Sequence, residues 1–396
     1  MKFNDSFDRL KGYCEKENFK GWDPYDGLNS WVIQKTPLGK SRLFRLAWIQ
    51  LFKRNPINLR PLFGIKKAYN PKGLGLFLIG YCNLYKQDNN QNYFNTITFL
   101  ANKIISLQTK GYSGACWGYN FDWQARAFYQ PKFTPTVVAT SFIVEALLQA
   151  YDISRNEQLI KTATSASNFI LNDLNKTYDE QGENYTLSYS PLDNTQVFNA
   201  GLLGAKTLVL IYQRTKEETL LIEARKIVSY ACSKQKTDGS WAYGTLPFHQ
   251  WIDNFHTGYN LECICFYQKI SGDKSFQKNL DNGLRYYLTE FFTDIGISKY
   301  YNNKTFPIDI HAPAQLIVTL SKMNLLQENI ILADKVLSWT INNMQSSKGY
   351  FYYQKKKWTL FRIPYIRWAQ SWMFYALSYY VKSPQNEKNK HSKDLY

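Results

Sequence analysis

The chain has 396 residues and carries 48 Lys and Arg against 31 Asp and Glu, a formal net charge of +17. A chain of this length is long enough to bury a large core, and 44% hydrophobic with only 20% charged residues excludes intrinsic disorder for its bulk. Aromatic residues reach 17%, a density that indicates flat side-chain faces on which a ligand can stack.

Helices rich in small and apolar residues recur about every sixty residues, which indicates an internal repeat. The sequence predicts six of them, at 71–86, 135–151, 195–213, 255–269, 311–323 and 367–381. Good N-caps precede several: Asn70 and Thr134 each stand before a proline, and Asn194 and Asp253 precede the third and fourth helices. Because these helices are apolar nearly all round, we expect them to be buried.

Amphipathic helices fill the intervals between these six. They are predicted at 93–107, 158–171, 219–234, 276–289 and 329–344, with a sixth at 41–52. Three of the stretches lead to a Gln and then a Gly, at Gln108–Gly111, Gln235–Gly239 and Gln345–Gly349. We expect each Gly to stop its helix, because glycine adopts the left-handed conformation at no steric cost. Aromatic runs that follow, such as 351–353, are expected to form short hairpins in the loops.

The alternation of the two helix types predicts an all-α fold, an (α/α)6 toroid in which six outer helices cover six inner ones. An open superhelix of helical hairpins is the alternative. We expect residues 1–69 to be a loop-rich segment that contributes the first outer helix, 70–382 to form the toroid, and 383–396 to be a disordered basic tail.

Four motifs together resemble a family of (α/α)6-toroid proteins from bacterial surface-polysaccharide and exopolysaccharide biosynthesis clusters. They are GWDPYDGLNS at 21–30, NPKGLGLFLIGY at 70–81, DGSWAYG at 238–244 and WIDNFHTGYNLECI at 251–264. Some members carry a δ-aminolevulinate dehydratase label, which does not suit this sequence because that enzyme is a TIM barrel and no strand–helix alternation is present. The stretch Gln235–Trp241 is more distantly similar to the repeat of terpene cyclase toroids. The resemblance implies a fold and a polysaccharide-biosynthesis context, and no reaction.

Polar residues at the starts of the inner helices are the candidate site residues, because these starts meet at the mouth of a toroid. The richest start is 253–260, where Asp253 or Asn254 caps the helix and His256, Tyr259 and Asn260 fall on one face. A His, a Tyr and an amide on one face are suited to polarising a carboxylate and moving a proton.

Other segments place similar residue types near inner-helix starts or in aromatic loops. Asp309 is placed either to orient the ring of His311 or to cap its helix. An Arg at a helix start, such as Arg367, is unfavourable beside the helix dipole and indicates an anionic ligand. As catalytic residues we expect His256, Tyr259, His311, Asp309 and Asp122; as substrate-binding residues Asn254, Asp253, Asn260, Trp123, Tyr119, Trp241, Tyr243, Arg367, Trp368, Asp23 and Asp26.

These residue types favour an enzyme that acts on an anionic, uronic-acid-containing saccharide by proton abstraction, as a C5-epimerase or a lyase does. One alternative is a non-catalytic scaffold that binds a glycan or a lipid-linked intermediate. Another is an inverting glycoside hydrolase, which needs two carboxyls on either side of the bond and would pair Asp122 with Asp253 or Asp309. Isoprenoid handling is the weakest reading; it requires a dry apolar cavity, and no DxDD or DDxxD motif is present.

The sequence lacks the signals of most cofactors and of nucleic-acid binding. It has no phosphate-binding glycine loop, no zinc-ligand spacing and no DNA- or RNA-binding signature, so we expect no metal, no cofactor and no nucleic-acid partner. Residues 1–20 lack the apolar core of a signal peptide, which predicts a cytoplasmic protein. The Lys-rich stretch at 40–67 and the basic C-terminal residues indicate peripheral contact with an anionic membrane surface. The oligomeric state is not indicated.

Overall fold

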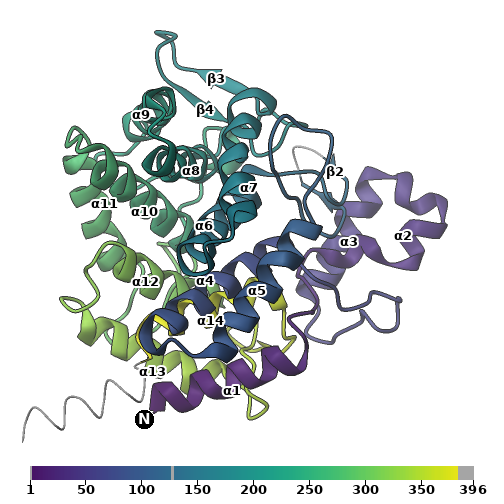
Figure 1. Cartoon of the computed structure of the whole chain (residues 1–396). Coiled ribbons are helices and arrows are strands. Elements are labelled where there is room, and N and C mark those ends of the chain that lie inside the picture. The colour runs from purple at the N-terminus through teal and green to yellow at the C-terminus, as the bar shows by residue number, and fades with distance from the viewer. Residues whose placement is uncertain (1, 126–128, 382–396) are drawn as a thin grey trace, which may run out of the picture.

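A closed ring of six inner helices forms the centre of the computed structural model, which describes residues 2–125 and 129–381 (Figure 1). The ring consists of α4 (Pro71–Asp88), α6 (Val137–Ser154), α8 (Phe198–Thr215), α10 (Asn254–Ser271), α12 (His311–Lys322) and α14 (Ser371–Tyr380). Each helix packs on the next, and α14 packs back on α4. The predicted toroid is therefore confirmed, and this closing contact excludes the open superhelix.

Six outer helices cover the ring, and one of them was predicted in the wrong place. They are α5 (Gln91–Ser106), α7 (Glu157–Asn168), α9 (Glu218–Ser233), α11 (Gln277–Glu290), α13 (Ile330–Met344) and α1 (Lys2–Lys16). The sixth outer helix is α1, which packs on α14, and not the helix expected at 41–52. That stretch forms α3 (Arg42–Arg54), whose contacts are with the 26–40 segment and β1 rather than with the ring.

The Gln–Gly repeat links one outer helix to the next. Gln235 Nε2 donates to the Asn279 carbonyl of α11 at 2.9 Å, and Gln345 Nε2 donates to the Ser6 carbonyl of α1 at the same distance. A Cβ atom on Gly349 would lie 2.2 Å from the Arg9 carbonyl oxygen, so only glycine fits against α1 there. The helices end before the Gln, at Ser233 and Met344 in these two repeats. Gly239 and Gly349 thus serve close packing in the following turn, whereas a side chain at Gly111 would meet open space. None of the three glycines stops its helix as we expected, since α5 also ends earlier, at Ser106.

Short strands and helical turns decorate the loops. The strands form two hairpins and a three-stranded sheet, all antiparallel: β1 (Trp123–Gln124) with β2 (Tyr129–Gln130), β3 (Lys176–Tyr178) with β4 (Tyr185–Leu187), and β5 (Ile308–Asp309) with β6 (Gln354–Lys355) and β7 (Leu360–Phe361). The hairpin expected at 351–353 is thus found just after that run. The helical turns are η1 (Asp26–Asn29), η2 (Pro37–Lys40), η3 (Phe169–Asp173), η4 (Pro247–His249) and η5 (Ile366–Gln370).

Two of the four expected helix caps lie elsewhere. Asn70 and Asp253 cap α4 and α10 as predicted, each accepting a backbone N–H in the first turn. For α6 the cap is Thr136, not Thr134. The helix α8 begins after Val197, beyond Asn194, without a side-chain cap.

A small lobe projects beside the ring (Figure 1). We call residues 31–67 the N-terminal lobe; it contains α2 (Trp31–Lys35), η2 and α3. Ile33 and Ile49 of the lobe form a small core together with Leu28 of η1. The division of the chain at 69 and 382 stays a prediction, and the tail predicted at 383–396 lies outside the described residues.

The ring helix α6 has the length and apolar composition of a membrane-crossing helix. In the structure, 72% of the apolar window from Val137 to Ser154 is buried. Because α6 packs between α4 and α8, its apolar surface is covered by neighbouring ring helices, as in the core of a globular protein.

Four buried charges join four inner helices. Glu145, Lys206 and Glu262 lie about two turns from the N-terminal ends of their helices, and Lys322 is the last residue of α12. Lys206 of α8 donates to Glu145 of α6 at 2.7 Å and also to Glu262 of α10. Lys322 of α12 donates to Glu262 at 2.8 Å and also to Glu145. Although burial opposes ionisation, the two ammonium groups hold the pKa of Glu145 at about 2. This closed square of charges binds the lower half of the ring together.

Candidate active site

A cavity of about 690 Å³ opens at the N-terminal ends of the inner helices and is bordered by α3. Its walls carry the basic side chains of Lys53, Arg54, Lys72 and Arg367 and three of the four histidines in the chain. Among the described residues that line it, none is Asp or Glu. The cavity is therefore electropositive and rich in hydrogen-bond donors, and it is not the dry apolar space that isoprenoid handling requires.

The helix backbones add to this positive field. The cavity is lined by first-turn or adjacent residues of all six inner helices, among them Lys72 of α4, Asn199 of α8 and His311 of α12. The N-terminus of each helix carries a partial positive charge from its unpaired N–H groups. Six such ends around one cavity favour an anionic ligand.

His256 is held by Asp253 at the start of α10. The Asp253 carboxylate accepts from the backbone N–H of His256 at 3.0 Å and lies 2.7 Å from its ring Nδ1, and Trp251 Nε1 donates to it at 3.0 Å. A proton on Nδ1 completes this contact and leaves the lone pair on Nε2. The His256 side chain lines the cavity and is 21% exposed, so it is suited to accept a proton.

Tyr259 and His311 form a second hydrogen-bonded pair. Tyr259 lies about one turn after His256 on α10, and His311 is the first residue of α12. The Tyr259 hydroxyl lies 2.7 Å from His311 Nε2, and His311 Nδ1 is buried with no hydrogen-bond partner among the described residues. A buried lone pair is tolerated better than a buried orphan N–H, which favours the proton on Nε2. His311 then donates to Tyr259 and leaves the phenol hydrogen free for the cavity. Burial raises the pKa of the Tyr259 phenol well above its usual value, so the hydroxyl keeps its proton until a reacting group takes it.

Lys72 lies at the base of the cavity, and the sequence reasoning missed it. Its Nζ lies 4.3 Å from the ring centre of Phe142 and 5.3 Å from that of Trp372, and it forms no ion pair within the described part of the chain. Burial, and then the nearby Arg367 guanidinium, hold the pKa of the Lys72 ammonium well below its ordinary value. The only signal was its place directly after the predicted cap Asn70–Pro71.

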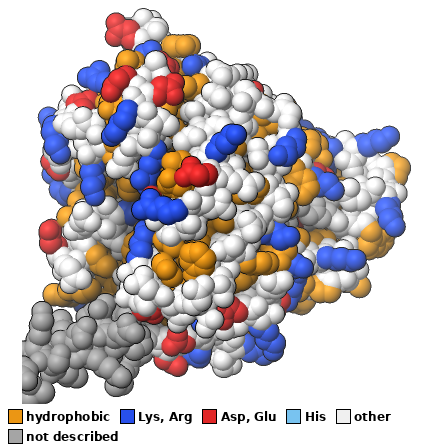
Figure 2. Space-filling view, viewed as in Figure 1, with side chains coloured by type: hydrophobic (Ala, Val, Ile, Leu, Met, Phe, Trp, Pro, Cys, Tyr) orange, Lys and Arg blue, Asp and Glu red, His pale blue; other side chains and the backbone are white. Residues whose placement is uncertain are grey.

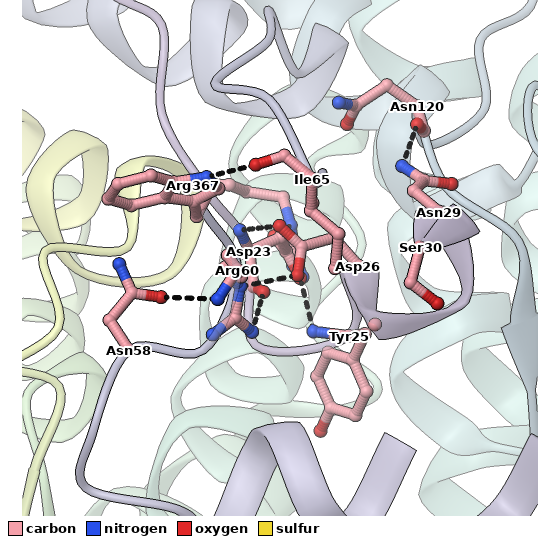
Figure 3. A network of polar contacts seen from close by, with 12 residues as sticks. Asp23, Tyr25, Asp26, Asn29, Ser30, Asn58, Arg60, Ile65, Asn120 and Arg367 are labelled. Carbon is pink, nitrogen blue, oxygen red and sulfur yellow. Dashed lines mark hydrogen bonds and ion pairs between the residues drawn. The ribbon is translucent and has the colours of Figure 1, made fainter. Parts of the chain in front are cut away.

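Arg367 is anchored by Asp23, which lies in the loop before η1. Its guanidinium donates to the Asp23 carboxylate through Nε at 2.6 Å and through a second nitrogen at 2.8 Å. Beside it, Arg60 is paired with Asp26 at 2.6 Å and donates to the Asp23 carbonyl at 2.7 Å (Figure 3). Asp23 and Asp26, which we expected to bind substrate, do not line the cavity; they hold the two arginines, of which Arg367 lines it.

Two predicted catalytic carboxylates lie behind the cavity wall. Asp309 does not contact the ring of His311; it accepts from the His311 backbone N–H, from Trp368 Nε1 and from Gln354 Nε2. Burial raises the pKa of Asp309 to about 6. Asp122 accepts from the Lys132 backbone N–H and from Gln34, which ties the N-terminal lobe to the ring. Neither lines the cavity, so the carboxylate pair of an inverting hydrolase is not assembled there.

Three predicted substrate-binding residues are also turned away from the cavity. Trp241 is buried and its indole N–H donates to the Ala231 carbonyl of α9. Asn254 is buried and accepts from Tyr287 of α11. Asn260 is buried with its amide oxygen unpartnered among the described residues. None of these three side chains is among those that line the cavity.

Aromatic residues supply most of the remaining wall. Tyr119, Trp123, Tyr243 and Trp368 line the cavity as predicted. The structure adds residues that the sequence reasoning did not select as site residues: His249, Trp251, Tyr25, Tyr189, Tyr300 and Tyr301. Tyr243 and Trp251 stack at 4.7 Å between ring centres. Flat faces of this kind suit the apolar faces of sugar rings.

Replacing Lys72 with Met is expected to stabilise the protein by about 1–2 kcal/mol at neutral pH, because it removes a buried amine. The lowered pKa means that the folded state binds fewer protons than the unfolded chain, so the destabilisation by Lys72 shrinks as pH rises towards the ordinary lysine pKa. Urea unfolding of both proteins at neutral and alkaline pH measures this difference. A variant that is less stable at every pH would contradict it, and Lys226→Met, a partly exposed lysine, is the control.

Solved structures of carbohydrate-active enzymes share this architecture. Cellobiose 2-epimerase from Bacillus thermoamylovorans matches with a TM-score of 0.61 and 12% identity over 80% of this chain and 90% of its own. A GH76 α-mannanase from Bacteroides thetaiotaomicron gives 0.61 and 12% over 82% and 89%, and an unsaturated glucuronyl hydrolase specific for heparin gives 0.57 and 11% over 82% and 88%. The chain shares the (α/α)6 toroid fold with these enzymes. No protein-family model and no curated protein matches it.

Proposed function

We propose that this protein is an enzyme that removes and returns a proton beside the carboxylate of a uronic-acid-containing saccharide, as a C5-epimerase or a β-eliminating lyase. The observation that carries the proposal is the cavity itself: four basic side chains and three histidines line it with no described carboxylate, at the meeting point of six helix N-termini. An anionic sugar fits this charge, and the aromatic walls fit its ring.

His256 is the proposed base. Its Nε2 lone pair takes the proton from C5, and the electron pair of the broken C–H bond moves into the carboxylate. Lys72 and Arg367 face the cavity and stabilise the negative charge that develops on the carboxylate oxygens. Lys72 gains its proton when the anion binds, because an adjacent negative charge raises its pKa.

Tyr259 is the proposed acid. In epimerisation its hydroxyl returns a proton to the opposite face of C5, and the His311 Nε2–H stabilises the resulting phenolate. In elimination the electron pair instead expels the oxygen at C4, and Tyr259 protonates that leaving group. Either route leaves His256 protonated, with its charge balanced by Asp253.

We place this reaction in the assembly of a bacterial surface polysaccharide, in the cytoplasm, on a lipid-linked or otherwise activated saccharide. The four motifs at 21–30, 70–81, 238–244 and 251–264 support this context by resemblance, and all four contribute cavity residues, among them Tyr25, Lys72, Tyr243 and His256. The toroid fold supports carbohydrate chemistry in general.

Incubation of the purified protein with glucuronate- and mannuronate-containing oligosaccharides in deuterated water tests the proposal. Deuterium at C5 without bond cleavage assigns an epimerase, and an unsaturated product with ultraviolet absorbance assigns a lyase. Saccharide binding with neither change would overturn catalysis and favour a scaffold. A new reducing end without unsaturation would overturn proton abstraction and favour hydrolysis.

A further inference from the structure

The N-terminal lobe is basic and contains no acidic residue. No Asp or Glu occurs between Asp26 and Asp88, whereas residues 31–67 contain nine Lys and Arg. Arg60 and Lys67 pair with Asp26 and Glu17, which lie outside the lobe. In the view of Figure 2 the projecting lobe carries blue and orange side chains and no red ones. Much of the net charge of the molecule is thus concentrated on one small surface.

The same lobe exposes large apolar side chains. Leu43, Ile57 and Leu62 are 77%, 68% and 74% exposed, and Trp31, Leu38 and Leu51 are also exposed. On α3, Leu43 and Leu51 lie on the outer face, two helical turns apart, while Ile49 and Phe52 are buried on the other face. Exposed apolar residues gathered within one short segment are typical of a surface that binds another protein or a membrane.

We propose that the N-terminal lobe docks onto an anionic lipid bilayer. Apolar side chains set among lysines and arginines are the chemistry that inserts into the headgroup region of such a bilayer, with the cations on its phosphates. A protein partner would need a complementary acidic surface. A second copy of the lobe does not offer one, because residues 31–67 contain no Asp or Glu and two such lobes would repel each other.

The lobe also connects this surface to the cavity. From α3, Leu46, Gln50, Lys53 and Arg54 line the cavity, while Leu43 and Leu51 of the same helix face outward. Docking through α3 therefore brings the cavity opening close to the lipid headgroups, where a saccharide attached to a membrane lipid would be presented. The docking itself is independent of the proposed reaction, and it is measured without any saccharide.

Sedimentation of the full chain with vesicles tests the docking. We expect binding to phosphatidylcholine vesicles that contain phosphatidylglycerol, at least tenfold weaker binding to phosphatidylcholine alone, and loss of binding at high salt. The triple variant Lys35→Gln, Lys40→Gln, Lys66→Gln is expected to bind roughly a hundredfold more weakly, at the usual contribution of each cation near a charged membrane.

A matched pair of apolar variants separates insertion from general surface change. Leu43→Ser, Ile57→Ser, Leu62→Ser together are expected to weaken binding at least tenfold. Ile222→Ser, Ile295→Ser, Ile331→Ser, at positions outside the lobe that are 54%, 68% and 71% exposed, are expected to leave binding unchanged. Thermal unfolding confirms that both variants fold. Equal effects of the two sets, or no binding of the parent protein to anionic vesicles, would overturn the proposal. Self-association that only the lobe variant abolishes, without vesicle binding, would assign the surface to a second copy instead.

Discussion

Replacing His256 with Ala is expected to lower kcat/KM for C5 proton exchange by about 10²–10⁴-fold, the usual contribution of a positioned general base. The reason is geometric: Asp253 fixes the His256 ring at 2.7 Å, and the ring lines a cavity that holds no described carboxylate able to replace it. The measurement is the rate of deuterium incorporation into a uronic-acid oligosaccharide.

Two further variants sharpen this expectation. Asp253→Asn retains a good N-cap for α10 but removes the charge that fixes the Nδ1 proton of His256, so it should lower kcat with little change in stability. Asp122→Asn is the control, because Asp122 contacts Lys132 and Gln34 outside the cavity. Loss of activity in Asp122→Asn together with full activity in His256→Ala would contradict proton abstraction and support hydrolysis.

The ring was predictable because its helices carry redundant signals. The start of α4 combines an Asn cap, a proline at the first position and an apolar run, and the structure begins that helix at Pro71 as expected. The start of α6 offers the same signals at Thr134 and Pro135, yet the helix begins at Val137 with Thr136 as its cap, and α8 begins at Phe198, three residues after the predicted start. Local cap chemistry therefore locates a helix start to within two or three residues and does not by itself fix the first one.

The sixth outer helix was misplaced because two segments compete for the role. The stretch 41–52 is richer in apolar residues, whereas 2–16 is more polar overall and carries a narrow apolar stripe at Phe7, Leu10 and Cys14, which the structure buries against the ring. Closing a ring requires the first and last repeats to meet, and no local pattern reports that contact. The pairing of Gln345 with Ser6 reveals it only in three dimensions.

Helix starts identified the region of the site but not which side chains enter the cavity. Asp253 and Asp309 both stand at such starts, and both are drawn to backbone N–H groups, which leaves the neighbouring histidines to face the ligand space. Lys72 is a lysine in a polar-looking cap sequence, and its burial follows from ring closure against Phe142 and Trp372 of other helices. These orientations are set by contacts between helices that are far apart in the sequence, and the pattern of a single segment does not show such contacts.

Replacing Glu262 with Gln is expected to lower the free energy of unfolding by about 3–5 kcal/mol, as removing one partner of a buried ion pair commonly does. Glu262 accepts from both Lys206 and Lys322, and its side chain is 3% exposed. Without its charge, two buried ammonium groups share Glu145 alone. Urea unfolding at neutral pH measures the loss. The exposed ion pair of Arg214 and Asp152 is the control, since Asp152→Asn should cost less than about 1 kcal/mol.

The dependence of stability on acid pH is a second measurable property of the same four charges. The pKa of Glu145 is about 2 in the folded protein against an ordinary 4.5, so its ionised form contributes stability above the ordinary value that is lost as pH falls towards 2. In Glu262→Gln the loss of one acid leaves Glu145 beside two ammonium groups, so its ionisation remains favoured and the acid-dependent part of stability persists.

Replacing all four charged residues with apolar ones of similar volume should remove that dependence while costing far less than the single change, because no buried charge is left unpaired. A quadruple variant as unstable as Glu262→Gln would show that shape, and not charge balance, holds the lower ring together.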